Sequence, residues 1–61
     1  MSVLWQTELD QAIQAGRNTK ESYSRLLESI DSPELRTVVR DLLLMEEMNE
    51  VLLNNLYVRN A

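Results

Sequence analysis

The side chains that could do chemistry lie in two short polar stretches, one in each half of the chain. The stretches consist of Gly16, Arg17, Thr19 and Lys20 in the first half and Glu46, Glu47, Asn49 and Glu50 in the second. Carboxylates at the middle of a helical bundle are the ligands from which di-iron and di-manganese sites are built. Glu46 and Asn49 have the i, i+3 spacing that places two ligands on one face of a helix. Glu46 is therefore a candidate metal ligand.

The same stretches have a second interpretation, in which they hold two helices together. Arg17 and Lys20 supply cations for the carboxylates of the second stretch, and Asn49 within an apolar row can fix register and oligomer state. We favour this interpretation because the stretches contain two cations and lack the imidazole that such metal sites use. The predicted polar belt consists of Arg17, Lys20, Glu46 and Asn49. Glu47 and Glu50 are expected to lie on solvated surface.

The composition excludes several familiar kinds of active site. The chain has no cysteine and no histidine, so disulfides, the common zinc sites and the familiar nucleophile–base triads cannot form. A single glycine excludes a glycine-rich phosphate loop. We therefore predict no catalytic residue, no cofactor and no enzymatic activity.

Charge and hydropathy narrow the range of partners. Ten acidic and six scattered basic residues give a net charge of -4, without the basic stripe that nucleic-acid binding needs. The longest apolar run is Leu42–Met45, far short of the roughly 20 residues that span a bilayer. We expect a cytoplasmic protein that binds neither DNA nor a membrane.

A turn signal divides the chain into halves of similar length. Ser32 is a good N-cap, Pro33 suits the first position of a helix, and Glu34 complements the positive end of the helix dipole. A connection this short makes the flanking helices antiparallel. Counting outward from the turn places Arg17 roughly opposite Glu46, so the two polar stretches should meet.

The predicted architecture is one domain (residues 1–61) with a helix over about 3–30, a turn at 31–32 and a helix over about 33–59. A break near Gly16 is the alternative, since Asn18 and Glu21 can cap a new helix there. The apolar spacing keeps its phase from Ile13 to Tyr23, which favours one continuous helix. In that helix, Gly16 is expected to mark a close helix contact.

Each predicted helix carries an apolar row at helical spacing that should face the other helix. The first row consists of Trp5, Leu9, Ala12, Ile13, Gly16, Thr19, Tyr23, Leu26, Leu27 and Ile30. The second row consists of Leu35, Val38, Val39, Leu42, Met45, Asn49, Leu52, Leu53 and Leu56. Trp5 is expected to cap the end of the bundle.

The second helix is more apolar than a two-helix hairpin can use. Outside its inward row it carries Leu43, Leu44, Met48, Val51, Tyr57 and Val58. We predict that Leu44, Met48, Val51 and Val58 form an oligomer interface. A chain this short buries only about 60% of the surface it exposes when unfolded. We therefore expect an all-α antiparallel hairpin that forms a homodimer, and thereby a four-helix bundle.

Two stretches of the chain resemble the rubrerythrin branch of the ferritin-like families. They are the stretch from Tyr23 to Arg36, which contains Pro33-Glu34-Leu35, and the stretch Leu43–Asn49. Those families carry a tyrosine in one helix, a Pro-Glu-Leu start to the next and a Glu-x-x-His motif within it. The similarity covers roughly residues 16–56.

The resemblance implies a ferritin-like hairpin that has lost its metal centre. Glu46 matches the glutamate of the motif, whereas Asn49 stands at the position of its histidine. The glutamate ligand of the first helix would fall on Gly16 or Arg17. Similar two-helix proteins dimerise, and some join larger protein assemblies.

The favoured function is a small self-associating ferritin-like protein without a catalytic metal centre, which acts as a structural or interaction module. One alternative is a reduced metalloprotein that binds iron or manganese between subunits through Glu46 and Glu50. Another is a small regulatory hairpin that binds a partner helix or structured RNA.

Overall fold

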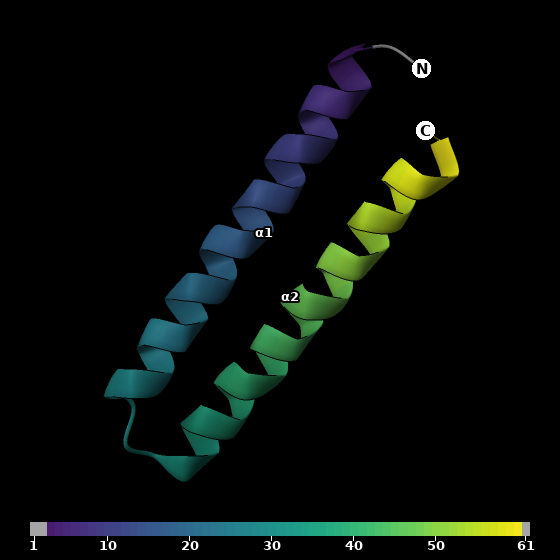
Figure 1. Cartoon of the computed structure of the whole chain (residues 1–61). Coiled ribbons are helices and arrows are strands. Elements are labelled where there is room, and N and C mark those ends of the chain that lie inside the picture. The colour runs from purple at the N-terminus through teal and green to yellow at the C-terminus, as the bar shows by residue number, and fades with distance from the viewer. Residues whose placement is uncertain (1–2, 61) are drawn as a thin grey trace.

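Two long helices and a short turn make up the hairpin. The computed structural model describes residues 3–60, of which α1 spans Val3–Ser29 and α2 spans Pro33–Asn60. The helices lie side by side and antiparallel, with the start of α1 and the end of α2 at one end and the turn at the other (Figure 1). The predicted all-α hairpin is confirmed. Neither described helix is long and apolar enough to cross a membrane.

The first helix is continuous through Gly16, so the three-helix alternative is wrong. Gln14 Nε2 donates a hydrogen bond to Asn18 Oδ1 at 3.0 Å, and Thr19 Oγ1 donates to the Ala15 carbonyl at 2.9 Å. These bonds follow the helical spacing of four residues across the glycine. Asn18 therefore lies inside a helix and does not cap a new one.

The turn is built as its sequence predicts. The Ser32 hydroxyl accepts a hydrogen bond from the Leu35 amide at 3.4 Å, and the Ser32 carbonyl accepts one from the Arg36 amide at 3.0 Å. Pro33 is the first residue of α2, where its missing N–H would have no helical partner. Ser32 is thus the N-cap of α2.

Arg36 ties the end of α1 to the start of α2. Its guanidinium donates hydrogen bonds to the carbonyls of Leu27 and Ile30, the second at 3.2 Å. The last carbonyls of a helix have no partner within the helix, and a cation is favoured at that end of the helix dipole. The half-buried Arg36 side chain therefore closes the turn end of the hairpin.

The contact between the helices is narrow. Among the described residues, the apolar side chains that are buried are Leu9, Ile13 and Val39, at 6–7% exposure, and none is fully buried. The predicted row of α1 is correct for most members, including half-buried Tyr23. It is wrong for Ala12 and Leu26, which are exposed.

The predicted inward row of α2 is largely wrong. The residues of α2 that face α1 are Arg36, Val39, Leu43, Glu46, Glu50, Leu53 and Tyr57, all buried or half-buried. The predicted members that are exposed are Leu35, Val38, Leu42, Met45, Asn49, Leu52 and Leu56. Long polar side chains fit the two-helix contact because they pack their stems against the partner and keep their charged ends in water.

The hairpin exposes more surface than a compact protein of its mass. Its Cα atoms span 46 × 16 × 10 Å, and its accessible surface is 4719 Å². A compact monomer of 7.1 kDa should expose about 4,100 Å². The excess of roughly 600 Å² follows from an architecture one helix layer thick.

Candidate functional site

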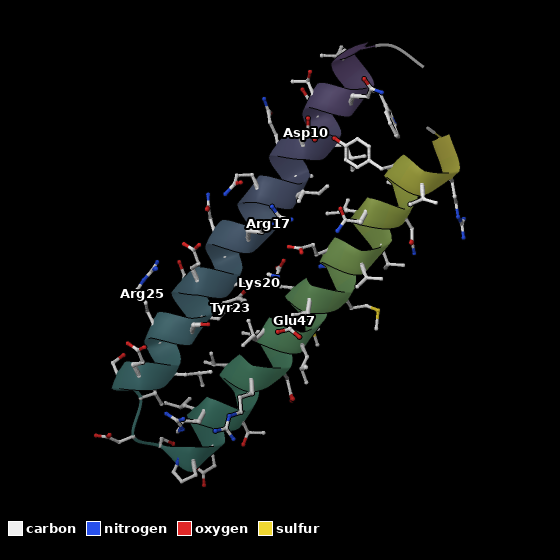
Figure 2. The ribbon with its side chains drawn as sticks, viewed as in Figure 1. Asp10, Arg17, Lys20, Tyr23, Arg25 and Glu47 are labelled. Carbon is white, nitrogen blue, oxygen red and sulfur yellow. The ribbon has the colours of Figure 1, made fainter. Side chains whose placement is uncertain are left out.

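The two polar stretches meet near the middle of the hairpin, as the sequence predicts. Glu50 of α2 accepts a hydrogen bond from Arg17 Nε at 3.2 Å, and its Oε1 atom lies 3.1 Å from Lys20 Nζ. Arg17 and Lys20 follow each other along α1 (Figure 2). The predicted pairing of these cations with a carboxylate of α2 is confirmed. Glu50 is half-buried, so its predicted place on solvated surface is wrong.

The two cations lower the pKa of the Glu50 carboxyl group. The hydrogen bond from Lys20 is the largest influence and lowers the pKa of Glu50 below its ordinary value of 4.5. Partial desolvation raises the pKa of Glu50, whereas the hydrogen bond from Arg17 lowers it further. Glu50 is therefore a carboxylate near neutral pH, and its charge is compensated by two cations.

Glu46 lies beside the glycine of α1. A Cβ atom placed on Gly16 would lie 3.5 Å from Glu46 Oε2, which is ordinary van der Waals contact. The close contact expected at Gly16 is therefore made with a flexible side chain, and the α2 backbone lies farther away. Glu46 is half-buried at this point.

Glu46, the candidate metal ligand, has no cluster of further potential ligands around it in the described part of the chain. Within residues 3–60 no group of three or more acidic, histidine or cysteine side chains is close enough to hold a metal ion. Asn49, the other candidate on this face, is exposed. Of the predicted polar belt, Arg17 and Lys20 form ion pairs, and the partner of both is Glu50 in place of Glu46 or Asn49.

A groove runs along one side of the hairpin between the belt and the open end. It has a volume of about 690 Å³. Small residues of α1 form one wall, namely Ala12, Ala15, Gly16 and Thr19, whereas Asn49, Leu52 and Leu56 of α2 belong to the other. The remaining lining residues are Ile13, Glu46, Glu50, Leu53, Asn55 and Arg59, so Asn49 lies in a groove with both apolar and polar walls.

A second depression, on the other side of the helix contact, is lined mainly by polar residues. It is shallower than the groove and is lined by Arg17, Lys20, Glu21, Ser24, Arg25, Leu43 and Glu47. Arg25 and Glu47 lie on this part of the two helices (Figure 2). The two depressions thus differ in character, since Leu43 is the one apolar residue that lines the second.

The open end of the hairpin has contacts that the sequence did not single out. Tyr57 donates a hydrogen bond to Asp10, and a tyrosine ring reaches from α2 to the labelled Asp10 in Figure 2. Trp5 packs its edge against the Tyr57 ring, with ring centroids 6.5 Å apart and an interplanar angle of 75°. Trp5 thus lies in the contact expected of it at the end of the helix pair. The four-residue spacing between Leu53 and Tyr57 could have placed Tyr57 on the inward face of α2.

The fold and the belt define an antiparallel helical hairpin with one ion-paired crossing. Comparison of the chain with protein-family models, with curated proteins and with solved structures gives no match.

Proposed function

We propose that this chain is a non-catalytic helical module that associates with a second copy to form a four-helix bundle. The observation that carries the proposal is the surface of 4719 Å², roughly 600 Å² more than a compact protein of this mass exposes. Burying that excess on two copies removes about 1,200 Å² from water, the lower end of the range for specific stable interfaces.

The character of the exposed surface supports association. Its large apolar members on α2 are Leu35, Val38, Leu42, Leu44, Met45, Met48, Val51, Leu52, Leu56 and Val58. Monomeric soluble proteins rarely expose contiguous apolar patches of this kind. The predicted interface residues Leu44, Met48, Val51 and Val58 belong to this set. A homodimer is the simplest assembly that covers part of this surface.

The proposal includes a ferritin-like arrangement of four helices without a catalytic metal centre. Gly16 and Arg17 occupy the positions at which the resemblance places the glutamate ligand of the first helix. Arg17 and Lys20 instead bring positive charge to the belt and pair with Glu50. Cations at this point oppose the binding of a further cation.

Native mass and thermal stability, measured together over a range of protein concentrations, test the proposal. Sedimentation equilibrium should give twice the mass of the 7.1 kDa chain. The melting temperature should rise with concentration, because mass action stabilises the folded dimer. A monomer mass at all concentrations, with a constant melting temperature, would contradict the proposal.

The same sample tests the metal-binding alternative. We expect no stoichiometric iron or manganese in protein purified with both metals supplied. Bound metal that disappears in Glu46→Ala, and remains in Glu47→Ala, would favour the metalloprotein.

A further inference from the structure

The exposed apolar residues of α2 form two separate surfaces. The groove surface consists of Asn49, Leu52 and Leu56 of α2 together with Ala12, Ala15 and Thr19 of α1, and polar side chains such as Asn55 and Arg59 also line it. The outer row consists of Leu44, Met48, Val51 and Val58. The groove surface takes residues from both helices, whereas the outer row lies on α2 alone. A partner on the groove surface can therefore cover both helices at once.

The groove surface is complementary to itself. Its α2 half carries large side chains, such as Leu52 and Leu56, and its α1 half carries small ones, such as Ala12 and Ala15. Helices pack by inserting large side chains of one into spaces on the other. In a second copy, the large side chains of α2 can pack over the small residues of α1 in the first copy, and the reverse holds as well. The second depression, which Arg25 and Glu47 help to line, lacks this pairing of large apolar side chains with small ones.

We infer that the second copy docks on the groove surface with its α2 lying over α1 of the first copy. The inference replaces the interface predicted from the sequence, because the outer row then stays outside the contact. This inference rests on the proposed self-association. A twofold axis along the hairpin places each α2 over the partner's α1, so large residues meet small ones on both sides. The alternative axis, across the hairpin, would place the leucines of α2 against each other and leave the alanines of α1 facing alanines.

The orientation has a geometric consequence. With the axis along the hairpin, the two turns lie at the same end of the dimer. Their backbones are then roughly 10–15 Å apart, since packed helices lie 8–10 Å apart. With the axis across the hairpin, the turns lie at opposite ends of a body whose length is 46 Å. The distance between the turns therefore distinguishes the two arrangements.

Neighbouring residues with equal exposure provide a matched test of the surface. Leu52 and Val51 are 56% and 57% exposed in the hairpin, so glutamate at the two sites should disturb the two-helix contact to a similar extent. Leu52→Glu would place a charge in the interface and should weaken dimerisation by at least about 100-fold. Val51→Glu should leave the dimer in place. The reverse pattern overturns the choice of surface but leaves self-association standing.

A second variant tests the small-residue wall without adding charge. Ala15 is exposed, and leucine is nearly as good a helix former as alanine. Ala15→Leu should therefore keep the hairpin folded yet fill the space for the partner's α2, and so weaken dimerisation by about tenfold or more. Ser24→Leu, which adds the same side chain at an exposed position in the other depression, is the control. Equal dimerisation of both variants would overturn the inference.

Spin labels at the turn test the orientation in the unperturbed interface. The chain has no cysteine, so exposed Asp31→Cys gives a single labelling site in each copy. Electron–electron double resonance should give one short label-to-label distance, roughly 15–30 Å once the label arms are added to the backbone separation. A distance near or above the 46 Å length of the hairpin would overturn the proposed orientation. A monomer mass for the wild-type chain would instead contradict the proposed function itself.

Discussion

Replacement of Gly16 by alanine separates the cost of a flexible residue from the need for space between the helices. Gly16 lies inside α1, far from either end. An added Cβ atom would meet Glu46 Oε2 at 3.5 Å, a distance at which neither group has to move. The glutamate side chain can also turn toward solvent. The structure therefore predicts that a methyl group fits here without strain.

The expected gain follows from helix propensity. Glycine in a helix interior is about 0.8–1.0 kcal/mol less favourable than alanine, because the unfolded chain loses less freedom when the residue has a Cβ atom. A gain of about 1 kcal/mol should raise the melting temperature of a chain this small by roughly 4–8 °C. The contact with Glu46 adds little to this value.

Thermal melts followed by circular dichroism at one fixed chain concentration measure the effect. Ala15→Gly on the adjacent exposed position is the control, and it should lower stability by a similar amount. A lower melting temperature for Gly16→Ala would refute the reasoning. It would show that the folded protein brings a group closer to Gly16 than the 3.5 Å contact allows.

Three further predictions concern the belt, the turn and the groove. Glu50→Gln should lose less stability than the wild type on acidification. The Lys20 hydrogen bond lowers the pKa of Glu50 in the folded protein, so the Glu50 carboxylate stabilises the fold at pH values above the ordinary value of 4.5. That stabilisation disappears as the pH falls through the pKa of Glu50 in the folded protein. Arg36→Gln should cost about 1.5–3 kcal/mol in urea unfolding, because charged hydrogen bonds to two carbonyls are lost. Asn49→Leu should tighten dimerisation by roughly tenfold or more, since burial of an amide in an apolar interface costs about 1–3 kcal/mol.

Controls make each of these predictions decisive. Glu47→Gln removes a carboxylate outside the ion pairs and should show the wild-type dependence on pH. Arg40→Gln removes an exposed cation of α2 and should change stability by less than about 0.5 kcal/mol. Weaker dimerisation of Asn49→Leu would contradict a place for Asn49 in the interface.

The turn and the continuity of α1 were predictable because they depend on local chemistry. Ser32 and Pro33 act within one turn of helix, and their preferences do not depend on the partner helix. The apolar spacing keeps its phase on both sides of Gly16, which likewise indicates a continuous helix from local sequence alone. Meeting of the two polar stretches followed from the turn position and the rise of a helix.

The inward face of α2 was not predictable, because apolar residues occupy several faces of that helix. Spacings of three and four fit Leu42, Met45 and Leu52 as well as they fit Val39, Leu43 and Leu53. The face that packs against α1 is the one that brings Glu50 to Arg17 and Lys20. The apolar spacing within α2 carries no information about the charged residues of α1.

The contact of Trp5 with Tyr57 decides what optical measurements on this protein report. Trp5 is the single tryptophan of the chain and lies at the open end, farthest from the closure made by Arg36. Its fluorescence therefore senses the last turns of the hairpin, whereas far-ultraviolet circular dichroism senses both helices along their length. Separation of the open end before the rest would make the two melting curves diverge. Such a divergence would record local opening at one end of a hairpin whose turn half is still folded.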